Sequence, residues 1–126
     1  MKLVLLAAVG GAFGSAARYL IGLASGQLFG LGFPWGTITV NIAGSFLMGL
    51  VIALGALKFS LPNELRVLIA TGFLGGFTTF SAFSLDFALL VERKDYGLAG
   101  LYLAGSVGLS ILALFAGLML VRTWLT

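Results

Sequence analysis

Uncharged polar side chains recur at helical spacing inside the long apolar stretches of this sequence. Thr37, Asn41 and Ser45 stand four residues apart, so on a helix they form one stripe. Hydroxyl groups in such a stripe ordinarily hydrogen-bond within or between helices. The amide of Asn41 is harder to satisfy inside its own helix, so we interpret it as a candidate donor to a permeating ion.

A second stripe has the same spacing and consists of Tyr102, Ser106 and Ser110. Interhelical hydrogen bonding is again the alternative interpretation. These donors carry no charge, and the few acidic residues do not form the carboxylate ring that is typical of a cation pore. The pattern favours a small anion that exchanges its water for hydrogen-bond donors, although composition does not identify the anion.

A glycine-rich and threonine-rich segment interrupts the third apolar stretch. Gly75-Gly76 followed by Thr78-Thr79 makes a poor helix interior. A helix that breaks at membrane depth leaves backbone carbonyls that protein, water or an ion must satisfy. Such carbonyls suit a small cation such as sodium, as in transporters with broken helices. The alternative is a close-packing face formed by Gly72, Gly75 and Gly76, of which Gly72 and Gly76 form a G-x-x-x-G pair.

Phenylalanines follow the same segment at helical spacing. Phe73, Phe77, Phe80, Phe83 and Phe87 recur every three or four residues, so they share one face if the helix is continuous. Packing or lipid contact is the usual role of such a stripe. The edge of a phenyl ring is electropositive, however, and a desolvated anion could lie against it.

The composition of the whole chain explains where these groups must lie. Of the 126 residues, 60% are apolar, only 9% are charged and 19 are glycine. Soluble domains are about one quarter charged, so this chain cannot cover a soluble surface. So many glycines predict membrane helices packed at close range. The absence of Cys and His excludes disulfides, Cys/His zinc ligation and His acid–base catalysis.

Gaps between charged residues predict four helices that cross the membrane. A helix needs about 20 apolar residues to cross the hydrocarbon, and the longest uncharged run, 19–57, contains turn residues between Gly26 and Gly36. We therefore expect an all-α membrane protein, with one domain over 1–126 and its third helix broken near the midplane. The expected spans are about 3–23, 35–57, 67–91 and 97–121.

Charge counts set little preference for orientation. With four spans both termini lie on one side, together with Lys2, Lys58, Arg66 and Arg122. The other side holds Arg93, Lys94 and, if it ends the first span, Arg18. This weak bias allows insertion in both orientations, and hence an antiparallel homodimer. A single orientation set by the first helix is the alternative.

Two isolated charges have open interpretations. Arg18 either extends to the interface or lines an aqueous vestibule that attracts anions. Asp86, late in the third span, is either a solvated end residue or a gate. We find no nucleophile with a base, no metal-binding carboxylate cluster and no phosphate loop, so an enzyme is not expected.

Three stretches resemble the bacterial Fluc (CrcB) fluoride channels: Arg18, the run from Gly36 to Asn41, and the run from Gly72 to Ser84. The resemblance extends over the whole chain. It implies a passive channel that exports cytoplasmic fluoride down its electrochemical gradient across the bacterial plasma (inner) membrane. It also implies a dual-topology antiparallel homodimer with two pores.

The resemblance further implies a set of site residues. A central sodium ion would be held by the backbone carbonyls of Gly75 and Thr78. The other implied residues are Asn41, Phe80 and Phe83 in the fluoride pore, Tyr102, Ser106 and Ser110 as a polar track, and Arg18 in a vestibule. The chain departs from its relatives at Asp86, where they carry Glu, which puts a gating role there in doubt.

Two other functions compete with a fluoride channel. A small dual-topology, proton-coupled multidrug exporter would need a carboxylate in its first span, and residues 3–23 contain none. A structural membrane subunit without transport would leave Asn41 and the broken third span unexplained.

Overall fold

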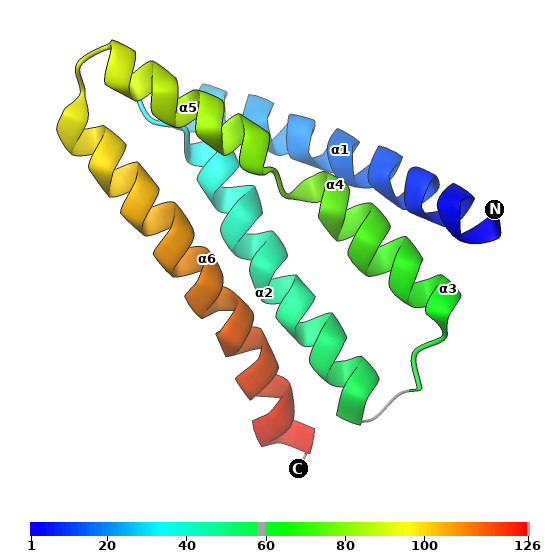
Figure 1. The fold of residues 1–126 in the computed structure, drawn as a ribbon. Helices are drawn as coiled ribbons and strands as arrows, with labels where there is room; N and C mark the ends of the chain where they lie inside the picture. The colour runs from blue at the N-terminus through cyan, green and yellow to red at the C-terminus, as the bar shows by residue number, and fades with distance from the viewer. Residues whose placement is uncertain (58–59, 126) are drawn as a thin grey trace.

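The computed structural model describes residues 1–57 and 60–125, and every regular element in them is helical (Figure 1). Four segments are long and apolar enough to cross a membrane, as predicted: Lys2–Phe29, Trp35–Ala56, Asn63–Glu92 and Tyr96–Trp124. The elements are α1 (Lys2–Phe29), α2 (Trp35–Leu57), α3 (Asn63–Arg66), η1 (Val67–Leu74), α4 (Gly75–Phe77), α5 (Phe80–Glu92) and α6 (Tyr96–Leu125). The third span therefore combines four short elements, of which η1 is a π-helix.

The first helix is longer than the sequence predicts. It continues past residue 23 to Phe29 and ends at Gly30, whose φ of 79° favours glycine. No charge or proline stops it earlier. Arg18 therefore lies inside α1 and not at its end, which corrects the side assigned to it in the charge count. Lys58, also in that count, lies outside the described residues.

The third span is broken, but not at the glycine pair. Gly75 and Gly76 are helical, and the chain becomes extended at Thr78 and Thr79 before α5 begins (Figure 1). The expectation that Gly75-Gly76 breaks the helix is therefore wrong in position. Gly76 stays helical in close contact with Gly11 of α1, so tertiary packing overrides its poor helix propensity.

Glycines bring two pairs of helices into close backbone contact. α1 packs along η1 and α4, where Gly14 meets the backbone of Phe73. α2 packs along α6, where Gly49 meets the backbone of Leu114. Small residues allow this approach between membrane helices. The packing face offered as the alternative is present at Gly72 and Gly76, which meet α1, but it does not include Gly75, where an added Cβ would meet only its own span.

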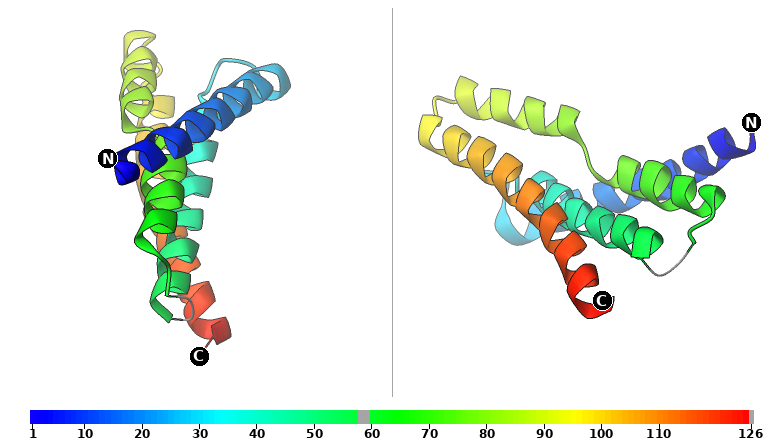
Figure 2. Two further views of the ribbon diagram at one scale, coloured as in Figure 1. Left: turned by 90° about the vertical axis from the view of Figure 1, so that its right-hand side faces the viewer. Right: turned by 60° about the horizontal axis from the view of Figure 1, so that its bottom comes forward.

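The break shifts α5 away from α4 and places it beside α6 (Figure 2). A cluster of buried side chains lies where α2, α5 and α6 meet, and it consists of Ile38, Phe83, Leu90, Ala99 and Tyr102. The connections α1–α2 and α5–α6 lie at the same end of the molecule (Figure 1).

Candidate functional site

A pocket of about 360 Å³, here called the inner pocket, lies between α2, the break and α6. Five of the six predicted pore residues line it: Asn41, Phe80, Phe83, Ser106 and Ser110. The lining also includes Ser45 of the α2 stripe and both threonines of the break. Tyr102, the sixth residue, does not line it. Two members of each polar stripe therefore face one space: Asn41 and Ser45 from α2, and Ser106 and Ser110 from α6.

Asn41 binds the backbone of the break. Its Nδ2 donates to the carbonyl of Thr79 at 3.0 Å, and its Oδ1 accepts from the Thr79 N–H at 2.7 Å. The amide of Asn41 thus finds its partners outside α2, on the backbone of the break. This agrees with the expectation that the amide is hard to satisfy within its own helix. Its Nδ2 carries two N–H groups, and only one is needed for the contact with Thr79.

Thr79 also begins the next helix. Its Oγ1 accepts from the N–H of Ala82 at 3.2 Å and so caps α5. Sequence analysis did not single out Thr79 as the partner of Asn41. A threonine in front of a new apolar run is a helix-start signal, and this signal could have located the break.

The broken helix redirects two N–H groups that a continuous helix would use. In an α-helix the N–H groups of Thr79 and Ala82 would donate to the carbonyls of Gly75 and Thr78. Here they donate to Asn41 Oδ1 and Thr79 Oγ1 instead. The two carbonyls proposed from the family resemblance as sodium ligands are therefore those that lose their helical partners.

Arg18 contacts the break from the other side. Its Nε donates to the carbonyl of Gly76 at 3.0 Å, from a half-buried position inside α1. It lines neither the inner pocket nor the second pocket described below. Neither the interface role nor the vestibule role considered for Arg18 predicts this contact. Through it, Arg18 ties α1 to the backbone of the third span by a hydrogen bond.

Two serine hydroxyls in the inner pocket lack a partner. Within the described residues, the Oγ atoms of Ser106 and Ser110 are buried and make no hydrogen bond. Ser106 is only 4% exposed. Leaving a buried polar group unsatisfied costs about 1–3 kcal/mol. Each hydroxyl can donate one hydrogen bond to a ligand or a water in the pocket.

The break divides the phenylalanine stripe. Phe73 and Phe77 stack at 5.7 Å between ring centroids before it, and Phe80 and Phe83 lie 5.4 Å apart after it. The single face expected for a continuous helix does not exist. Only Phe80 and Phe83 line the inner pocket; Phe83 is buried, whereas Phe80 is 75% exposed.

Tyr102 is fully buried and links the inner pocket to Asp86. Its ring packs on Phe83 with centroids 5.2 Å apart, and its hydroxyl donates to Asp86 Oδ2 at 3.1 Å. Asp86 is therefore neither a simple solvated end residue nor isolated. The pairing was not predicted, because residues 86 and 102 lie on different helices.

These features define a helical membrane protein whose broken span and uncharged polar side chains line one pocket. The family model for CrcB-like protein, Camphor Resistance (CrcB), matches residues 5–118. The chain belongs to this CrcB family.

Relatives in the family are similar over nearly their full length. One is the Fluoride-specific ion channel FluC of Rhodospirillum centenum, 53% identical over 98% of both chains. Another, from Chelativorans sp., has the same name and is 54% identical over 95% of this chain and 96% of its own. The Fluoride-specific ion channel FluC 1 of Nitrobacter hamburgensis is 49% identical over 94% of both.

Proposed function

We propose that this chain is a fluoride-specific ion channel that exports cytoplasmic fluoride passively across the bacterial inner membrane. Its close relatives bear that name. The observation that carries the proposal is the pair of buried, unpartnered hydroxyls of Ser106 and Ser110 beside Asn41. Fluoride is small and strongly hydrated, so its passage requires donors that replace water. Uncharged donors do this without binding the ion too tightly to leave.

The ring edges of Phe80 and Phe83 complete the fluoride path in this proposal. An edge presents positive partial charge, whereas a ring face would repel the anion. Both rings lie against the inner pocket with Asn41. The path then continues along the polar track formed by Ser110, Ser106 and Tyr102 on α6.

The functional unit in this proposal is an antiparallel, dual-topology homodimer with two pores. One subunit leaves Phe80 exposed at the inner pocket, so a second copy is needed to enclose the path. With Arg18 inside α1, four cations on the terminal side stand against two on the other, and this small excess still permits insertion in both orientations.

A sodium ion fits the break in such a dimer. Among the described residues, no group of three or more His, Cys, Asp or Glu side chains could hold a metal. The backbone carbonyls of Gly75 and Thr78, which lose their helical donors, are ligands of the kind that broken membrane helices offer to sodium. When bound, sodium would supply a fixed positive charge beside an anion path.

Fluoride efflux from liposomes containing the purified protein tests the proposal. A fluoride electrode should record rapid efflux, with no comparable chloride efflux. A cationic dye tests the multidrug-exporter alternative: proton-driven dye transport without fluoride efflux would overturn the channel. Neither activity in a correctly folded protein would favour a structural subunit.

A further inference from the structure

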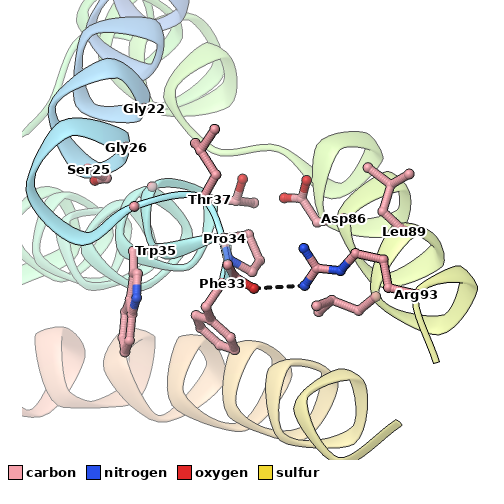
Figure 3. Close-up of a pocket in the computed structure, with 15 residues that line it drawn as sticks. Gly22, Ser25, Gly26, Phe33, Pro34, Trp35, Thr37, Asp86, Leu89 and Arg93 are labelled. Carbon is pink, nitrogen blue, oxygen red and sulfur yellow. Dashed lines mark hydrogen bonds between the residues drawn. The ribbon is translucent and has the colours of Figure 1, made fainter. Parts of the chain in front are cut away.

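A second pocket, here called the outer pocket, has a volume of about 250 Å³ and lies at the end of the molecule that carries the α1–α2 and α5–α6 connections (Figure 3). α1, the loop before α2, the start of α2, and α5 form its walls. Its polar side chains are Ser25, Thr37, Asp86 and Arg93. None of these four lines the inner pocket.

Polar groups lead from the inner pocket to the outer pocket along two helices. On α2, Asn41 lines the inner pocket and Thr37, one turn earlier, lines the outer pocket. On α6, Ser106 lines the inner pocket, and Tyr102, one turn earlier, donates to Asp86 of the outer pocket. Tyr102 is 0% exposed and lines neither pocket, but it contacts Phe83 of the inner pocket and Asp86 of the outer pocket.

The outer pocket has a fixed cation at its edge. Nη2 of Arg93 donates to the carbonyl of Gly32 at 2.8 Å and pairs with Asp95 Oδ2 at 3.1 Å. These contacts hold the guanidinium across the pocket from Thr37 (Figure 3). Both use Nη2, so the N–H donors of Nη1 and Nε are not needed for them.

Arg93 and Asp86 are opposite charges in the same small pocket. They stand seven residues apart, or two helical turns, and so lie on one face of α5. A carboxylate next to the end of an anion path repels the ion that must pass. A guanidinium in the same pocket offsets that field, and a concave site focuses its attraction.

We propose that the outer pocket is the aqueous mouth of the fluoride path and that Arg93 is its anion-attracting residue. The proposal rests on the proposed fluoride conduction and on the contacts of Tyr102 with Phe83 and Asp86. Glu92, Arg93, Lys94 and Asp95 together carry no net charge. The attraction is therefore local to the pocket, and Asp95 weakens it.

The test is the initial rate of fluoride efflux from liposomes at low and high ionic strength. Arg93→Gln should lower the rate roughly three- to tenfold at about 0.01 M ionic strength. The Debye length falls from about 30 Å there to about 3 Å at 1 M, so potassium gluconate at high concentration should remove most of the difference. Arg93→Lys should keep most of the wild-type rate.

Lys94→Asn is the matched control. Lys94 is the neighbouring cation but does not line the outer pocket. Its φ of 64° is a conformation that asparagine tolerates. This variant should conduct like the wild type at both ionic strengths.

Asp95→Asn tests the same charge without removing Arg93. It takes away the carboxylate that pairs with the guanidinium, so the rate at low ionic strength should rise above that of the wild type. If Arg93→Gln does not fold, this variant still tests whether the charge of Arg93 affects the efflux rate.

Three results would contradict the proposal that Arg93 attracts anions at the outer pocket. They are an unchanged rate in Arg93→Gln, a deficit of the same size at both ionic strengths, and an equal deficit in Lys94→Asn. Each of these results would refute the role of the outer pocket but not the proposed function, because the wild-type protein would still conduct fluoride. A wild-type protein without fluoride efflux would remove the proposed function and the mouth together.

Discussion

At the scale of single residues, three side chains hold the backbone where the third span breaks. Asn41 binds both polar groups of Thr79, Arg18 binds the carbonyl of Gly76, and Thr79 caps α5. The sequence singles out Asn41 because polar side chains at membrane depth are costly, and Arg18 because it is an isolated charge between apolar runs. It could not assign their partners, since these lie on other helices far along the chain.

Asn41→Asp should sharply reduce fluoride efflux. The change removes the N–H that donates to the Thr79 carbonyl and places a negative charge in the inner pocket. A loss of about 1–3 kcal/mol corresponds to about five- to 150-fold in rate. Fluoride efflux and dimer content by size exclusion are the measurements. Thr39→Val, on the exposed side of α2, is the control, and unchanged efflux in Asn41→Asp would contradict a role for the amide.

Ser106→Ala and Ser110→Ala should reduce efflux several-fold without lowering the stability of the subunit. Their hydroxyls have no partner in the described chain, so removing them breaks no internal hydrogen bond. Ser15→Ala, at an exposed position of α1, is the matched control. Full efflux together with a lower unfolding midpoint would show that the serines are structural.

Phe80→Met and Phe83→Met should change fluoride efflux, whereas Phe73→Met should do little. Methionine has similar bulk but no ring edge. Phe80 is the sharper test because its side chain is exposed and its loss costs the subunit little packing. Efflux and dimer stability in detergent are measured together. Full transport in both variants, or loss only where the dimer dissociates, would refute a pore role for the rings.

At the scale of helices, hydropathy predicts the four spans well, because charged residues bound most apolar runs and turn residues divide the longest one. It predicts the end of α1 poorly, since residues 24–29 contain no proline and Gly26 alone does not end a helix. Helix propensity alone places the break at the glycine pair, because it takes no account of contacts with other helices. In the fold, Gly76 is held helical by α1, and Asn41 takes the hydrogen bonds of Thr79.

The two neighbouring glycines should respond differently to substitution. A Cβ at Gly75 would meet only an ordinary contact, 3.7 Å from the Ala70 carbonyl, whereas one at Gly76 would lie 2.6 Å from the Gly11 carbonyl. Gly76→Ala should therefore destabilise the subunit by about 1–3 kcal/mol. Gly75→Leu should leave helix content intact and reduce dimerisation and fluoride efflux.

Thr78→Ser is the mild control for this pair, because it keeps the Oγ1–Leu74 carbonyl bond of 2.9 Å and every backbone carbonyl. Circular dichroism, light scattering and fluoride efflux distinguish the three variants. Normal dimers with full efflux in Gly75→Leu would count against carbonyl ligands on a dimer axis.

At the scale of the whole molecule, composition alone identifies a membrane protein, and the match to the CrcB family fixes its class. The outer pocket was not predictable, because it depends on how the loop after α1 meets the end of α5. In the sequence Arg93 is one of two cations between the third and fourth spans, and only the fold brings it to the Gly32 carbonyl. The exposed Phe80 marks the side on which a second copy is expected.

The central claim is passive conduction of fluoride ions, and its most direct test is the electrical coupling of efflux. Liposomes loaded with potassium fluoride are diluted into fluoride-free buffer, with and without valinomycin. A passive channel moves net charge, so efflux should stall at once without valinomycin and run to completion when potassium can follow. Complete efflux in the absence of any potassium pathway would show electroneutral, proton-coupled transport and would contradict the account.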